Sequence, residues 1–131
     1  MTFLARISPV LLSLLRFMSG LLVLQHGTSK ILQFPTGPMN ATPLTSMSGI
    51  GGFFELICGA LLVVGFQSRI AAFLLSGMTA VAYFTVHEPN GFFPLLNGGE
   101  LAVLYCFTFL YLAAAGPGPI SIDAVTGRRA A

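Results

Sequence analysis

Four apolar segments separated by turn-forming residues are the strongest constraint on the fold of this chain. The segments run over residues 10–31, 50–66, 70–86 and 98–115. Proline and glycine gather between most of them, as is typical of turns and loops. A membrane-spanning helix needs roughly 20 apolar residues, so the three shorter segments would be completed by flanking residues or by local thinning of the bilayer. The pattern predicts an all-α integral membrane four-helix bundle that forms a single domain over residues 1–131.

The composition indicates that the surroundings of this chain are lipid. Hydrophobic residues make up 55% of the sequence and charged residues 8%. A soluble domain is about a quarter charged, and a water-soluble globule would need more polar residues to cover its surface. Six Lys and Arg against four Asp and Glu provide no basic surface, so nucleic acid is not expected as a partner. Cys58 and Cys106 lie inside apolar segments without a CxxC motif, which favours packing over thiol chemistry.

The distribution of basic residues predicts the orientation of the helices. Four spans would place both termini on the same side of the membrane as the turn at residues 67–69. That side carries four arginines: Arg6, Arg69, Arg128 and Arg129. The basic residue of the opposite side is Lys30, at the membrane boundary. Because Lys and Arg accumulate on the cytoplasmic side, both termini are expected in the cytoplasm, with the loops at 32–49 and 87–97 facing outward.

Polar side chains inside the apolar segments gather near the outward ends of the helices. Such groups are costly in lipid, and they usually face the bundle interior or mark a functional site. The first segment has a stripe within an arc of about 80° on a helix, formed by Arg16, Ser19, Val23, His26 and Lys30. This stripe should face the other helices. Arg16 lies deeper or toward the cytoplasm. The candidates for ligand binding or proton exchange are His26, Lys30, Glu55, Tyr83, His87, Asn97, Glu100 and Arg16. No catalytic residue is assigned.

Several candidates also have a purely structural interpretation. Asn97 and Glu100 could form a helix N-terminal capping pair. Glu55 lies too deep for capping and would form an ion pair with Lys30 or Arg16. Arg16 and Lys30 could instead extend to the lipid headgroups on their own sides.

Two further features leave the ligand and the oligomeric state open. His26 and His87 lie at one depth and are weak candidates for metal or haem ligation, but no closely spaced ligand cluster accompanies them, so no metal is predicted. Small residues at Ala72, Ser76 and Ala80 recur every four positions, a spacing that lets helices approach closely in lipid. This seam would pack either within the bundle or against a second copy of the chain.

Three stretches resemble the DoxX-type membrane proteins of bacteria. Arg16 with Gln25-His26-Gly27 and Lys30 is similar to the opening of that family. Gly51-Gly52-Phe53-Phe54-Glu55 and the run to Gly65-Phe66 resemble its second helix. The most specific stretch runs from Ala82 to Glu100 and includes Tyr83, His87 and Asn97. The resemblance extends over about residues 10–123.

The resemblance implies a four-helix protein of the bacterial cytoplasmic (inner) membrane. Members have been associated with quinone oxidoreductases as small membrane subunits and with oxidative-stress complexes. We therefore expect a component of a quinone-linked redox system with a polar ligand pocket near the periplasmic ends of its helices. The pocket would hold a quinone or a similar apolar ligand, and haem or metal is less expected. The chain has no evident electron carrier, so an enzymatic role would require a redox partner subunit or a bound cofactor.

Two other functions fit the same sequence. In the first, the protein is a non-enzymatic assembly factor or scaffold, whose polar layer only locks the helices together. In the second, it is a small transporter, although polar groups at one end of the bundle do not form a path through the membrane.

Overall fold

The computed structural model describes residues 2–127, and within this range the chain is helical, with no strand. Arg128 and Arg129, which contributed to the predicted orientation, lie outside the described residues. The longer helices are α1 (Thr2–Leu32), α2 (Met47–Val64), α3 (Ser68–Ala82) and α5 (Glu100–Ala115). The shorter elements are η1 (Pro38–Ala41), η2 (Tyr83–His87), η3 (Glu88–Asn90), α4 (Pro94–Asn97) and α6 (Ile122–Val125).

Three helical stretches are long and apolar enough to cross a membrane. These are Thr2–Leu32, Met47–Val64 and Ser68–Asn90. The third continues α3 through η2 and η3, and its 23 residues cover about 34 Å at the α-helical rise, enough for a hydrocarbon core of about 30 Å. Helix α5 is apolar but has 16 residues. The prediction of an all-helical chain, with helices long and apolar enough to span a membrane, is thus confirmed.

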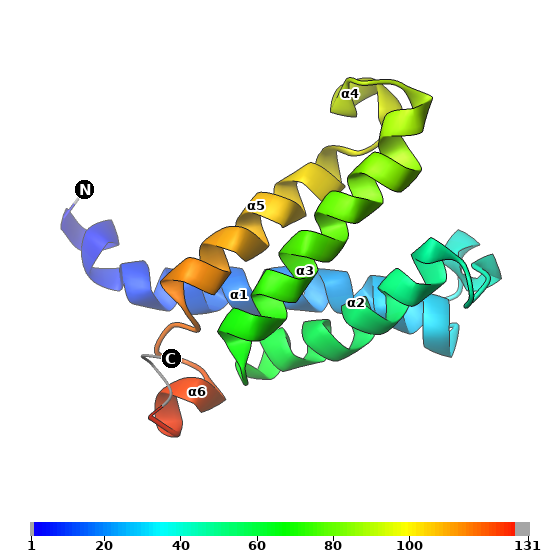
Figure 1. Ribbon diagram of the computed structural model, residues 1–131. Coiled ribbons are helices and arrows are strands. Elements are labelled where there is room, and N and C mark those ends of the chain that lie inside the picture. Colours follow the sequence, from blue (N-terminus) through cyan, green and yellow to red (C-terminus); the bar gives the residue numbers. More distant parts are fainter. Residues whose placement is uncertain (1, 128–131) are drawn as a thin grey trace.

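The helices are arranged as two packed pairs that cross at an angle. Helix α1 packs along α2, and α3 packs along α5. The pairs lie close together at the turn between α2 and α3, and they diverge toward the ends that carry η1 and α4 (Figure 1). We call the turn side the closed end and the opposite side the open end.

Glycine contacts bring α1 and α2 unusually close together. A methyl group on Gly27 would lie 2.6 Å from Cα of Leu56, and one on Gly59 would lie 2.9 Å from Cα of Leu24. Real Cβ atoms do not occupy such positions. In lipid, where apolar burial drives helix association little, small residues of this kind allow the backbones to make direct van der Waals contact.

The small-residue seam of α3 packs within the chain. Ala72 and Ser76 are buried, and the hydroxyl of Ser76 donates a hydrogen bond to the carbonyl oxygen of Cys106 in α5 at 2.8 Å. Of the two arrangements expected for this seam, the structure has the internal one. The surrounding core includes Leu62, Leu75 and Phe109, whose side chains are fully buried between the two pairs.

Arg16 holds the C-terminal segment against the closed end. Its side chain is 2% exposed, so the alternative in which it extends to the headgroups is wrong. The guanidinium donates to the carbonyl oxygens of Leu62 and Val63 at the end of α2, and to those of Pro117 and Ile120. Free carbonyls at a helix C-terminus carry partial negative charge, so they stabilise the buried guanidinium at this end.

Asp123 closes the same end from the other direction. Its two carboxylate oxygens accept hydrogen bonds from the backbone N–H groups of Gln67 and Ser68, both at 2.9 Å. These donors open α3, where the helix dipole favours an anion. The segment that follows α5 therefore caps two helix ends at once, together with Arg16.

Candidate functional site

An ion pair between Lys30 and Glu55 lies at the open end, where α1 faces α2. Lys30 Nζ is 3.0 Å from Glu55 Oε1 and 2.9 Å from Oε2. The two side chains are 10% and 7% exposed, respectively. Of the two partners expected for Glu55, the structure selects Lys30, and Lys30 does not extend to the headgroups. Gly52 enables this contact, because the Lys30 side chain passes over it at a distance that leaves little room for a Cβ atom.

His26 extends this charged group toward α5. Its Nδ1 atom lies 3.9 Å from Glu55 Oε1. Its ring meets Tyr105 edge-on, with ring centroids 6.4 Å apart. The stripe predicted along α1 is confirmed in its deeper part, because Ser19 and Val23 are buried along with Arg16.

Tyr83, His87 and Asn97 form a second polar group on the α3–α5 pair. The Tyr83 hydroxyl donates to the carbonyl oxygen of Phe92 at 2.8 Å, and Asn97 Nδ2 lies 3.3 Å from the same hydroxyl. His87 Nδ1 is 3.3 Å from the carbonyl oxygen of Asn97. These bonds fasten the loop between α3 and α5 to the end of α3.

The end of α3 widens into a π-helix over Tyr83–His87. Short π-helical turns are rare and frequently occur at functional sites. The sequence predicts an uninterrupted helical segment over residues 70–86 and gives no sign of this widening. In the structure the rings of Tyr83 and His87 are nearly parallel, with an angle of 25° between their planes.

A cavity of about 420 Å³ lies between the two helix pairs at the open end. Helix α1 contributes His26 and Lys30, α2 contributes Glu55, and the π-helix contributes His87. The cavity therefore brings together four of the predicted candidates from three segments of the chain. We call it the inner cavity.

The remaining candidates lie elsewhere. Tyr83 and Asn97 do not line the inner cavity and instead hold the neighbouring loop. Glu100 is exposed at the start of α5. The expected capping pair is wrong: the N-cap of α5 is Gly99, and Asn97 ends α4 while accepting from Gly99 N–H at 2.8 Å. Arg16 belongs to the closed end.

Tyr105 and Met78 line the inner cavity but were not among the predicted residues. Helix α5 is apolar around its whole circumference, so its sequence does not indicate which face is buried. Unlike α1, this helix has no polar stripe that would identify its inner face. Along residues 2–127, no group of three or more His, Cys, Asp or Glu side chains is placed to hold a metal ion.

Comparisons with known proteins identify the family. The DoxX family model matches residues 11–88. The chain is also 40% identical over 121 residues to an uncharacterized protein of Haemophilus influenzae, covering 88% of this chain and 90% of that protein. The chain belongs to the DoxX family. A second uncharacterized protein of the same organism is 31% identical over 86 residues, which are 66% of this DoxX chain and 57% of that protein. No solved structure matches this DoxX chain.

Together, the family and the apolar helices make this chain a DoxX family membrane protein that lies in a lipid bilayer. The DoxX model ends at residue 88, so it covers His26, Lys30, Glu55 and His87. These are the four predicted residues that line the inner cavity.

Proposed function

We propose that this DoxX protein is a small membrane component of a quinone-linked redox system and binds a quinone in the inner cavity. The observation that carries the proposal is the buried Lys30–Glu55 pair in the wall of a cavity formed largely by apolar side chains. A quinone ring is apolar with polar carbonyl groups at opposite edges, so it matches a site of this character.

The side chains of the cavity suit the protons that accompany quinone chemistry. Reduction of each quinone carbonyl to a hydroxyl takes up one electron and one proton. Glu55 and His26 can accept or supply a proton, and Lys30 can donate a hydrogen bond to a carbonyl oxygen. Electrons would reach the ligand from a redox partner subunit. A haem or metal held by His26 and His87 is the weaker alternative.

We further propose that the protein is a multi-pass protein of the bacterial inner membrane with both termini in the cytoplasm. Arg69 lies at the closed end and Lys30 at the open end, so the inner cavity would lie toward the periplasm. A membrane-impermeant thiol reagent in intact spheroplasts tests this orientation. Asn40→Cys should be labelled from outside, whereas Arg6→Cys should be labelled only after the membrane is opened. The reverse pattern would overturn the orientation.

Ligand binding is tested with purified protein in mild detergent. Addition of a short-tailed benzoquinone should raise the melting temperature of the wild-type protein, because a ligand that binds the folded state stabilises it. Glu55→Gln should lose most of that shift. Glu88→Gln is the matched control, since Glu88 lies at the same end but outside the lining of the inner cavity. No shift in the wild-type protein, together with no quinone in a solvent extract, would refute the proposal.

A scaffold or assembly role is the second candidate. Its support is that Lys30 and Glu55 form a buried ion pair between α1 and α2 and that His87 and Asn97 hold a loop. In this case His26→Ala and His87→Ala would lower stability equally with and without added quinone. A transporter is less favoured, because fully buried Leu62, Leu75 and Phe109 fill the space toward the closed end.

A further inference from the structure

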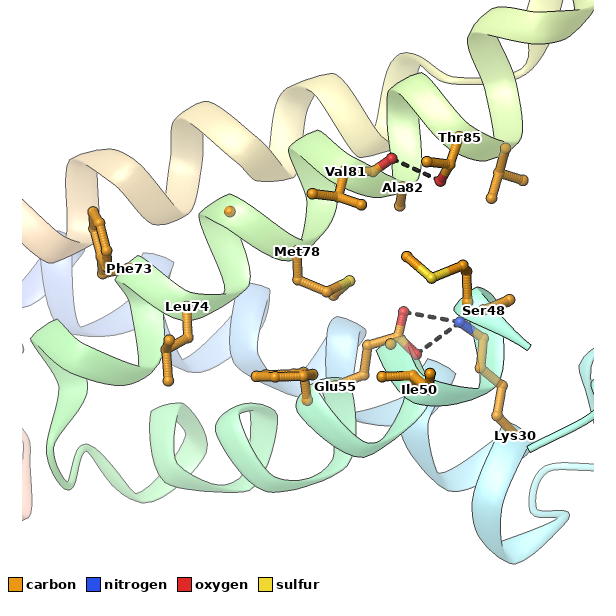
Figure 2. A pocket seen from close by; sticks show the side chains of 15 residues that line it. Lys30, Ser48, Ile50, Glu55, Phe73, Leu74, Met78, Val81, Ala82 and Thr85 are labelled. Atoms are coloured by element: carbon orange, nitrogen blue, oxygen red, sulfur yellow. Dashed lines mark hydrogen bonds and ion pairs between the residues drawn. The ribbon is translucent and has the colours of Figure 1, made fainter. Parts of the chain in front are cut away.

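A second cavity adjoins the inner cavity and opens sideways between α2 and α3. It has a volume of about 370 Å³, and we call it the lateral groove. The two cavities share Lys30, Ser48, Glu55, Met78, Ala82 and Val86 as lining residues. Figure 2 shows the lateral groove, with the Lys30–Glu55 pair on one side and the apolar side chains of α3 on the other.

Apart from the ion pair and a few hydroxyls, the lateral groove is apolar. Phe73, Leu74 and Val81 line it from α3, and Phe54 lines it from α2. All four side chains are exposed in the isolated chain, and on membrane-spanning helices that exposure is toward lipid. The lateral groove therefore faces the hydrocarbon region of the bilayer and shares a wall with the inner cavity.

Met78 and Glu55 stand where the two cavities meet. The Met78 side chain extends from α3 toward Glu55 (Figure 2) and lines both cavities. A flexible thioether adapts readily to a neighbouring ligand. Glu55 Oε2 is fully buried and, although it lies 2.9 Å from Lys30 Nζ, it has no aligned hydrogen bond from a described donor. A ligand hydroxyl at this junction would find an acceptor with unused capacity.

We infer that the two cavities form one bipartite site, in which the inner cavity takes the ring of the ligand and the lateral groove takes its apolar tail. This inference rests on the proposed quinone function and adds the class of ligand: a quinone with a long isoprenoid or alkyl chain, received directly from the bilayer. A tail that runs out between α2 and α3 stays in apolar surroundings throughout, so the ring can reach Glu55 while the chain remains in contact with lipid.

Gly77 allows the tail position to be tested without disturbing the fold. It lines the lateral groove but not the inner cavity, and a Cβ atom placed on it would meet nothing within 4 Å. Gly77→Leu therefore fills the groove from α3. Ala60→Leu is the matched control, because Ala60 is an exposed small residue of α2 that lines neither cavity.

The experiment compares the affinities of a tailless benzoquinone and the same ring with a decyl chain, measured on the full chain in nanodiscs. Gly77→Leu should weaken binding of the decyl compound by about tenfold, the effect of overpacking an occupied apolar site, and leave the tailless compound unchanged. Ala60→Leu should change neither affinity. Unchanged tailless binding also shows that the variant is folded.

Other results would separate the two proposals. If Gly77→Leu affects both compounds equally or neither, while Glu55→Gln weakens both, the ring site stands and the tail position is wrong. If the wild-type protein binds neither compound, the quinone function fails and the tail position fails with it. As a second measurement, a quinone with a photoreactive group at the end of its tail should label residues 70–81. Labelling confined to α1 or α5 would overturn the inference.

Discussion

Arg16 in α1 and Ile120 beyond α5 are joined by a hydrogen bond from the guanidinium to the Ile120 carbonyl oxygen. The same guanidinium also reaches Pro117 and the end of α2. Replacing Arg16 with Met should destabilise the protein by about 3 kcal/mol, because hydrogen bonds from a buried charge contribute about 1.5–3 kcal/mol. The loss should appear in detergent unfolding and as faster proteolysis after Gly116. Arg6→Met, at an exposed site, should leave both unchanged, and equal behaviour of the two variants would contradict the assigned role.

The Lys30–Glu55 pair should show strong coupling in a double-mutant cycle. Lys30→Met or Glu55→Gln alone should each lower the free energy of unfolding by about 3–5 kcal/mol, since each leaves a buried partner uncompensated. The double variant should lose clearly less than the sum of the two. Chemical denaturation in detergent measures all four proteins. Additive losses would mean that the two groups do not stabilise each other in the folded protein.

Two glycines should respond in opposite ways to the same added methyl group. Gly27→Ala places Cβ 2.6 Å from Leu56 Cα, so the helices must separate, at a cost of about 1–3 kcal/mol. Gly77→Ala meets nothing within 4 Å and should be neutral or stabilise by up to about 1 kcal/mol, through its greater helix propensity. Melting temperatures of the two variants provide the comparison. A loss of stability in Gly77→Ala as large as in Gly27→Ala would contradict the packing described here.

Tyr83→Phe should loosen the loop between α3 and α5. The variant lacks the hydroxyl that donates to Phe92 and lies beside Asn97, at a cost of about 1 kcal/mol. Amide hydrogen exchange in residues 91–98 should become faster, while exchange in α2 stays the same. Tyr111→Phe, on an exposed part of α5, is the control. Unchanged exchange in the loop would show that the hydroxyl does not hold it.

The sequence predicts the α1 side of the site because polar residues stand out on an apolar helix. Their angular positions place Ser19 and Val23 inside. Because an unpaired charge is costly in lipid, Glu55 is expected to pair with one of the few basic residues in the spans. Helix α5 lacks this contrast. Glu100, Phe107 and Tyr111 are exposed on this helix, whereas Tyr105 is buried.

Other features depend on contacts between residues that are distant in the sequence. No local pattern brings Arg16 to Pro117, because that contact exists only after the chain folds back beyond α5. The register of α1 against α2 likewise decides whether Gly27 faces the backbone of α2 or open space. The widening of α3 at Tyr83 is also hidden, because the residues of this stretch fit an ordinary α-helix equally well.

The divergence of the two helix pairs has a consequence for motion. The two helix pairs are joined firmly at the closed end and separated at the open end. A small hinge motion near the Arg16 and Asp123 contacts therefore produces a larger displacement at the open end. Segments with fewer buried contacts open at a lower free-energy cost. Protection of backbone amides from hydrogen exchange should therefore decline along each helix pair, from the turn between α2 and α3 toward η1 and α4. The open end, which carries the ion pair, would fluctuate in width, while the closed end serves as the hinge.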